Sequence, residues 1–253
     1  MPNKIAFITG ASSGIGMAIA KRFAKEGINL ILNARRLDRL EKLKLELEEE
    51  NDIKILLCPF DIRHKNEIDT AISQIPDDWK DIYYLINNAG LASGLGNLHE
   101  GDIEDWEKMI DTNVKGLLYI SRIILPGMVE RKAGHVVNIS SIAGKEVYAN
   151  GNVYCASKFA VDALSRGMRI ELSPYNVKVT SINPGAVETE FSIVRFHGDK
   201  ERADKVYEGF DNLLAEDIAD AAYYAISRPQ RMNINEMIVM PTAQPVATII
   251  NRQ

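Results

Sequence analysis

Short apolar segments alternate with longer amphipathic segments along this chain, and the alternation strongly limits the folds it can adopt. The seven apolar segments that we predict to be strands are Lys4–Thr9, Leu30–Asn33, Ile53–Leu57, Ile82–Ile86, His135–Ile139, Val177–Ile182 and Met237–Met240. Strands that alternate with helices favour a parallel sheet covered on both faces, because parallel neighbours need crossover connections. We therefore predict a doubly wound α/β fold whose seven-stranded sheet is mostly parallel.

Length and composition indicate one globular domain. The chain has 253 residues, 46% hydrophobic and 26% charged, without a Pro/Gly/Ser-rich linker, so we predict a single domain over residues 1–253. A net charge of -5 and the lack of a dense Lys/Arg stripe argue against nucleic-acid binding. Two cysteines and four scattered histidines indicate a reducing compartment and no metal site. No apolar stretch approaches membrane-spanning length, and we expect a cytoplasmic protein.

A glycine-rich loop follows the first predicted strand and opens the first helix. Its spacing is Gly-x-x-x-Gly-x-Gly, which permits a tight turn and lets a pyrophosphate approach the helix N-terminus. The residues that we expect to contact the dinucleotide here are Gly10, Ser12, Ser13, Gly14, Ile15 and Gly16. A plain strand-to-helix turn is the alternative, but the first-strand context favours a Rossmann-type dinucleotide site.

The second predicted strand ends in Asn33-Ala34-Arg35-Arg36. An enzyme that prefers NAD would place an acid there to hold the ribose 2′-hydroxyl, and this chain has none. Guanidinium groups bind a 2′-phosphate well, so Arg35 and Arg36 predict NADP, with Ser12 or Ser13 assisting. Alternatively, both arginines only decorate the start of a charged helix.

Two further cofactor contacts are predicted where the third and fourth strands end. A carboxylate at Asp61 could accept from an adenine amino group while the Ile62 amide holds a ring nitrogen. In Asn88-Ala89-Gly90, small residues would let the backbone approach the cofactor, and the asparagine would tie neighbouring strands together. Loop capping is the alternative for this second group.

A Tyr-x-x-x-Lys pair, Tyr154 and Lys158, lies in a predicted helix, with Ser141 thirteen positions upstream of the tyrosine. Residues four apart share a helix face. A cation about 4 Å from the phenol would lower its pKa of near 10 by about three units and make it a usable base. Such pairs also occur by chance on solvated helices.

Five motifs together resemble the classical short-chain dehydrogenase/reductase family over essentially the whole chain: Thr-Gly-x-x-x-Gly-Ile-Gly, Asn-Asn-Ala-Gly, an internal Asn113, Ile-Ser-Ser-x-Ala-Gly and Tyr-x-x-x-Lys. The resemblance implies a catalytic set of Asn113, Ser141, Tyr154 and Lys158. It implies that Tyr154 exchanges the proton, Ser141 orients the substrate oxygen, Lys158 reaches the nicotinamide ribose and Asn113 holds a water. It also implies a homotetramer, and nicotinamide-side contacts from Pro184, Gly185, Val187 and Thr189.

Four segments show a narrower resemblance to the NADP-dependent 3-hydroxy acid dehydrogenases, which include serine and L-allo-threonine dehydrogenases. They are residues 105–113, 151–154, 189–196 and the C-terminal tail. The resemblance implies substrates such as serine and 3-hydroxypropionate, whose carboxylate needs a cation. Arg195 is the first candidate for that cation and Lys145 the second.

Two segments are expected to complete the site. Residues 188–212 mix aromatic and charged side chains without clean periodicity, as in a lid over substrate, although a surface helix is the alternative. The apolar tail, residues 241–253, is expected to pack on a neighbouring subunit. Two other functions stay open: a reductase of general carbonyl or 3-oxoacyl substrates, and a non-catalytic NADP-binding sensor.

Overall fold

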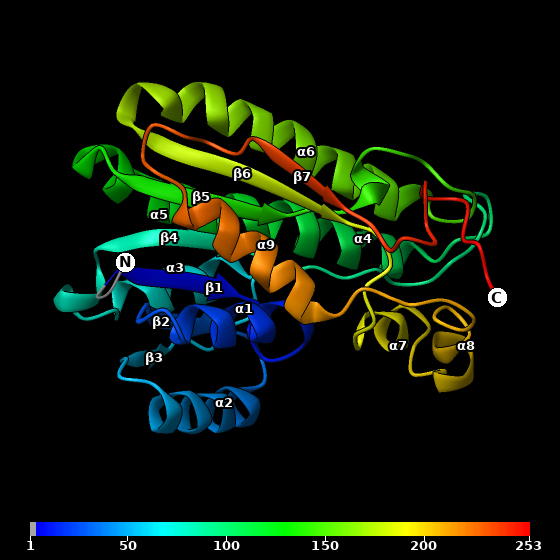
Figure 1. The fold of residues 1–253 in the computed structure, drawn as a ribbon, viewed down its shortest axis with the longest axis horizontal. Helices are drawn as coiled ribbons and strands as arrows, with labels where there is room; N and C mark the ends of the chain where they lie inside the picture. The colour runs from blue at the N-terminus through cyan, green and yellow to red at the C-terminus, as the bar shows by residue number, and fades with distance from the viewer. Residues whose placement is uncertain (1–3) are drawn as a thin grey trace.

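The computed structural model describes residues 4–253, and in this range seven strands form one sheet in the order β3-β2-β1-β4-β5-β6-β7 (Figure 1). The strands are β1 (Ile5–Thr9), β2 (Asn29–Asn33), β3 (Ile55–Leu57), β4 (Ile82–Asn87), β5 (Gly134–Ile139), β6 (Val177–Pro184) and β7 (Glu236–Val239). Every pairing is parallel, so the sheet is parallel throughout rather than mostly so. The seven-stranded α/β prediction is confirmed.

Helices cover both faces of the sheet (Figure 1). They are α1 (Gly14–Ala24), α2 (Leu37–Glu50), α3 (Lys65–Ser73), α4 (Ile103–Ile110), α5 (Leu117–Arg131), α6 (Asn152–Leu172), α7 (Phe191–Arg195), α8 (Lys200–Asp204) and α9 (Ala215–Ser227). One apolar core joins the sheet to α1, α2 and α9, and a second joins it to α3, α5 and α6. Neighbouring residues in β1 alternate between them: Ile8 packs in the first core and Phe7 in the second. Burial on both faces explains why the strands are continuous apolar runs.

The order of the strands reverses between β1 and β4, because β2 and β3 lie on one side of β1 and β4 to β7 on the other. In open parallel sheets this reversal leaves a crevice at the carboxyl ends of the strands, where ligands bind. The fold therefore places the glycine-rich loop after β1 and the Asn88-Ala89-Gly90 segment after β4 beside each other.

A π-helical turn, Asp111–Gly116, connects α4 to α5 and was not predicted. Single π turns inside helices are frequent at functional sites, and this one carries Asn113. Among residues 4–253, none of the helices combines the length and apolarity needed to cross a bilayer.

The C-terminal tail folds back onto its own chain beyond β7. The Gln253 amide donates to the Gly209 carbonyl at 2.8 Å, and the Asn251 amide donates to the Ala243 carbonyl at 2.9 Å. The tail therefore rests on the segment predicted to be the lid. Its predicted packing on a neighbouring subunit stays a prediction.

Candidate active site

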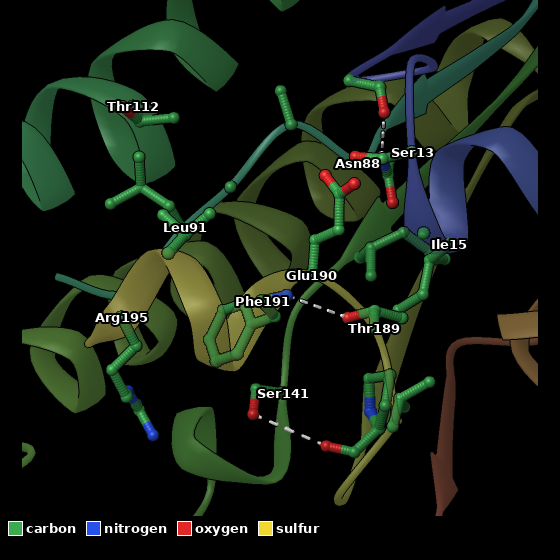
Figure 2. Close-up of a pocket in the computed structure, with 18 of the residues that line it drawn as sticks. Ser13, Ile15, Asn88, Leu91, Thr112, Ser141, Thr189, Glu190, Phe191 and Arg195 are labelled. Carbon is green, nitrogen blue, oxygen red and sulfur yellow. Dashed lines mark hydrogen bonds between the residues drawn. The ribbon is translucent and has the colours of Figure 1, made fainter. Parts of the chain in front are cut away.

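A cavity of about 510 Å³ lies at the carboxyl ends of the strands, and residues of most motifs discussed above line it. Figure 2 labels Ser13, Asn88, Ser141 and Thr189 among them. The walls of the cavity come from the loops after β1, β2, β3, β4, β5 and β6, from the segment 188–212 and from the C-terminal tail. The predicted contacts that line it include Ile15, Ile62 and Ala89, and also Pro184, Val187 and Thr189 from the end of β6 and the loop that follows it. The described residues contain no group of His, Cys, Asp or Glu side chains that could hold a metal ion.

The glycine-rich loop turns sharply at Gly10, whose φ of +68° is in the left-handed region that favours glycine. A Cβ on Gly16 would lie 2.3 Å from the Gly10 carbonyl oxygen, so only glycine fits there. Ser13 is the N-cap of α1, yet its side chain makes no capping bond, and the first turn has no acidic residue. The first amides of α1 thus form an anion site into which a pyrophosphate fits.

Arg36 is oriented by the serines of that loop. Its Nη2 donates to Ser13 Oγ at 2.9 Å and to Ser12 Oγ at 3.3 Å. Arg35 is more exposed, and its Nη1 lies 3.7 Å from an Asp61 carboxylate oxygen. Two guanidinium groups after β2 and two hydroxyls from the loop after β1 are the donor set that a 2′-phosphate requires. These residues therefore fit NADP.

Asp61 has a partner that the sequence analysis missed. Arg63 Nη2 donates to its carboxylate at 2.6 Å. Burial would raise the pKa of Asp61, but hydrogen bonds from Arg63 outweigh burial and hold this pKa below its ordinary value. Arg63 also lines the cavity, so the adenine ring of a cofactor could stack on the Arg63 guanidinium as well as contact the Asp61 carboxylate. The one sequence feature that could have indicated this ion pair is the basic residue two positions after Asp61.

The loop after β4 is held against β1 by Asn88. Its Nδ2 donates to the Thr9 carbonyl at 2.9 Å, and its backbone amide donates to Thr9 Oγ1 at 3.0 Å. Two residues on, a Cβ at Gly90 would lie 3.3 Å from Asn113 Oδ1 and 3.4 Å from Lys158 Nζ. The predicted strand-tying role of Asn88 is confirmed, and the absence of a side chain at Gly90 keeps the floor of the cavity open.

Three of the four predicted catalytic residues, Ser141, Tyr154 and Lys158, line the cavity. Asn113 lies behind them, where its amide bonds both the Leu91 amide and carbonyl at 2.8 Å. Lys158 Nζ lies 5.8 Å from the centroid of the Tyr154 ring and donates to the Ile139 carbonyl at 3.1 Å. The Ser141 hydroxyl hydrogen-bonds with Tyr154. The fold thus brings the Tyr-x-x-x-Lys pair and Ser141 together at one wall of the cavity.

The expected fall in the pKa of Tyr154 is wrong for this arrangement. Burial raises the pKa of Tyr154, as does the neighbouring Tyr148, whereas Arg195 and the Ser141 hydrogen bond oppose the rise. Burial also lowers the pKa of Lys158 to about 8. The sequence argument considered charge alone, and both side chains are almost fully buried, so desolvation dominates. The chain by itself therefore keeps the proton on the phenol.

Arg195 enters the cavity from the end of α7 (Figure 2). Its Cζ lies 5.0 Å from the centroid of the Tyr154 ring and 5.2 Å from that of Phe191. One nitrogen, Nη2, donates to the Tyr148 hydroxyl at 2.6 Å, while the buried Nε has no hydrogen-bond partner among residues 4–253. Sequence reasoning missed Tyr148 and Phe191, which hold this guanidinium beside the phenol.

Lys145 is the wrong choice for a substrate-binding cation. Its Nζ pairs with Asp162 at 2.6 Å and with Glu236 at 2.7 Å, and it does not line the cavity. Asp162 lies in α6 and Glu236 in β7, and neither is near Lys145 in the sequence, so these two ion pairs could not be predicted from the sequence.

The segment 188–212 leaves and rejoins the fold at one place. Val187 and Leu213 form a parallel bridge, and the Glu188 amide donates to the Leu213 carbonyl at 2.9 Å. Between these ends lie α7 and α8 (Figure 1). Residues of α7, together with Val206 and Tyr207 after α8, line one side of the cavity. The far side is tied down where the Gly94 amide donates to the Arg195 carbonyl at 2.9 Å. The geometry is that of a flap with a narrow base, and its closure on substrate stays a prediction.

Comparisons with known proteins agree with this geometry. Residues 4–199 match the family model described as short chain dehydrogenase. The NADP-dependent 3-hydroxy acid dehydrogenase YdfG of Salmonella typhi is 46% identical over 96% of this chain and 97% of its own length. The serine 3-dehydrogenase of Agrobacterium fabrum is 42% identical over 95% of this chain and 94% of its own. A structure of the closed form of serine dehydrogenase complexed with NADP+ superposes with a TM-score of 0.92 at 43% identity, covering 98% of this chain and all of that one.

Proposed function

The chain belongs to the short-chain dehydrogenase family and is an NADP-dependent oxidoreductase acting on hydroxyl groups, and we propose that its substrates are small 3-hydroxy acids. The observation that carries the proposal is the Arg195 guanidinium, which lies beside Tyr154 and whose buried Nε has no hydrogen-bond partner in the part of the chain that the structure describes. The names of the relatives, 3-hydroxy acid dehydrogenase and serine 3-dehydrogenase, point the same way.

In the proposed reaction Tyr154 exchanges the proton with the substrate oxygen. NADP, when bound, supplies the hydride acceptor or donor at its nicotinamide ring. Ser141 shares a hydrogen bond with Tyr154, so an oxygen that contacts both hydroxyls is oriented for proton transfer. Lys158 supplies a nearby positive charge when protonated, and Asn113 holds Leu91, which packs in the same apolar cluster as Tyr154.

A 3-hydroxy acid carries its carboxylate two carbons from the reacting carbon. With the hydroxyl at Tyr154 and Ser141, the carboxylate would extend toward Arg195, whose Nε is buried and unpaired. A buried donor without a partner is costly, and a carboxylate would satisfy it with a charge-assisted hydrogen bond. A simple alcohol would leave it unsatisfied. This asymmetry supports acids over neutral alcohols.

The proposal is tested by NADP reduction with serine, L-allo-threonine, 3-hydroxypropionate, 3-hydroxyisobutyrate and two neutral compounds, 3-hydroxypropionamide and a secondary alcohol. Arg195→Met should lower kcat/KM for the acids by about 10- to 100-fold, as expected for a lost hydrogen bond to a charged group. The kcat/KM for 3-hydroxypropionamide should fall far less in this variant. Arg202→Met, in α8 of the same segment, is the matched control. Equal losses for acid and amide, or wild-type activity on the alcohol alone, would contradict the proposal.

A reductase of general carbonyl or 3-oxoacyl substrates is the second candidate, and the same substrate panel separates it. A non-catalytic sensor is disfavoured because Ser141, Tyr154 and Lys158 all line the cavity. The proposal includes a cytoplasmic homotetramer. The outer surface of α6 exposes Phe159 by 40% and Ile170 by 76%, which supports subunit contacts there. Light scattering on the purified protein would give the mass of the assembly.

A further inference from the structure

A carboxylate from the flap is bound to the arginines at the start of α2. Glu190 immediately precedes α7, and Figure 2 shows its side chain extending toward Ser13. Its Oε2 accepts from Arg36 Nη1 at 3.1 Å, and its two oxygens accept from Arg39 Nη1 at 2.8 and 3.0 Å. Sequence reasoning missed both Glu190 and Arg39. The Glu190 carboxylate places a negative charge at the site predicted for a 2′-phosphate.

Arg36 is consequently shared between two sets of groups. Nη2 faces the hydroxyls of Ser12 and Ser13, which fit a phosphate, while Nη1 holds Glu190. Hydrogen bonds from Arg39 and Arg36 hold the pKa of Glu190 below its ordinary value against its partial burial. Glu190 is therefore ionised at neutral pH. A carboxylate on one side of a guanidinium reduces what that guanidinium can offer to an anion on the other.

We propose that Glu190 competes with the cofactor 2′-phosphate for Arg36 and thereby sets how strongly this enzyme prefers NADP to NAD. The inference rests on the assignment of Arg35 and Arg36 to the 2′-phosphate. A phosphate monoester carries nearly two negative charges at neutral pH, so an adjacent carboxylate repels it. NAD has a hydroxyl at this position, which a carboxylate tolerates or binds. Glu190 thus weakens the phosphate-bearing cofactor selectively.

Arg39 gives the displaced carboxylate an alternative partner. It does not line the cavity, yet it holds both oxygens of Glu190. Glu190 can release Arg36 while keeping Arg39, so Arg39 limits the competition. Its loss should leave Glu190 bound to Arg36 alone and increase the penalty on phosphate.

The purely structural alternative makes the opposite prediction. If Glu190 served to hold Arg36 in position for phosphate, its removal would weaken phosphate binding. Two probes isolate the 2′-phosphate: adenosine 2′,5′-bisphosphate and adenosine 5′-monophosphate, which differ only in that group. The dissociation constant of the monophosphate divided by that of the bisphosphate, both measured by calorimetry, gives the contribution of the 2′-phosphate to binding. This ratio does not depend on turnover.

In the E190Q variant, we expect this ratio to favour the bisphosphate by about 2- to 5-fold more than in wild type, the range for a partly exposed charge pair. The matched control is E188Q, which removes an exposed carboxylate two residues earlier and should leave the ratio unchanged. The R39M single variant should have a lower ratio than wild type. The same substitution made in the E190Q protein should lower the ratio by a smaller factor. Circular dichroism confirms that each variant is folded.

The outcomes separate the inference from the assignment beneath it. Wild-type protein that binds both probes equally would refute the arginine assignment and the inference together. A wild-type preference for the bisphosphate that E190Q leaves unchanged or weakens would overturn the inference alone. An equal gain in E188Q would also overturn it, because net charge rather than contact with Arg36 would then be the cause.

Discussion

Replacing Lys158 with methionine should stabilise the cofactor-free protein while removing its activity. Lys158 is buried, and burial lowers its pKa from the ordinary 10.5 to about 8. At about 1.4 kcal/mol per pKa unit, keeping this amine charged in the fold costs about 3 kcal/mol at neutral pH. Methionine is also unbranched and carries no charge, so Lys158→Met removes that penalty.

One loss offsets part of this gain. The Ile139 carbonyl, which accepts from Lys158 Nζ at 3.1 Å, loses that bond, and a lost hydrogen bond costs about 1 kcal/mol. The net expectation is about 2 kcal/mol of added unfolding free energy, equivalent to a Tm higher by about 4 to 8 °C for a chain of this length.

The pH dependence identifies the cause. Below pH 8 both the folded and the unfolded wild-type chain carry the proton on Lys158. Between about 8 and 10.5 the unfolded state binds more protons than the folded state, so the stability of the wild type rises with pH. Lys158→Met lacks this rise. The difference between the two proteins should therefore be largest at pH 7 and should shrink as pH approaches 10.5.

Denaturant unfolding at several pH values and one fixed protomer concentration measures these quantities. Lys80→Met is the control, because Lys80 is exposed and pairs only with Asp77 on the surface, so its replacement should have little effect. A Lys158→Met protein that is less stable than wild type at pH 7, or a difference that does not change with pH, would refute the reasoning.

Three further substitutions test the site. Tyr154→Phe should abolish turnover and leave the dissociation constant of NADPH, measured by fluorescence titration, nearly unchanged, since only the proton carrier is lost; a fully active variant would remove Tyr154 from the mechanism. Arg35→Ala should raise the KM for NADP far more than that for NAD, and equal effects would contradict the 2′-phosphate assignment. Gly16→Ala should impair folding or NADPH binding, because its Cβ would lie 2.3 Å from the Gly10 carbonyl oxygen; wild-type Tm and affinity would show that the loop adapts.

The strands were predictable because burial on both faces requires continuous apolar residues. Phe7 and Ile8 face opposite cores, and neither position could be polar without an unsatisfied group. Element ends were less predictable. Strand β3 begins at Ile55, two residues after the start predicted at Ile53, although Ile53 is itself buried. The π turn at 111–116 has no sequence signal at all, since an extra residue in a helical turn is decided by packing.

The residues of the site likewise fall into those that the sequence predicts and those that it does not. The residues of local motifs, such as Tyr154 and Lys158, were found because a fixed spacing reveals a shared helix face. Glu190 and Tyr148 were missed because each acts on a partner distant in sequence, Arg36 and Arg195 respectively. The direction of the pKa shift at Tyr154 was also missed. Spacing indicates which charges are near, whereas desolvation depends on everything packed around them.

If the substrate is a 3-hydroxy acid, as proposed above, its binding and the proton transfer are coupled through Arg195. Arg195 and Ser141 are the groups that favour the phenolate of Tyr154 against its burial. A carboxylate bound to Arg195 would neutralise one of these two influences and would raise the pKa of Tyr154 further, whereas a neutral alcohol would not. With an acid bound, the chain's own groups then hold the phenol protonated most firmly. The cation that then remains beside the phenol is Lys158, whose Nζ lies 5.8 Å from the centroid of the Tyr154 ring and whose burial disfavours its charged form.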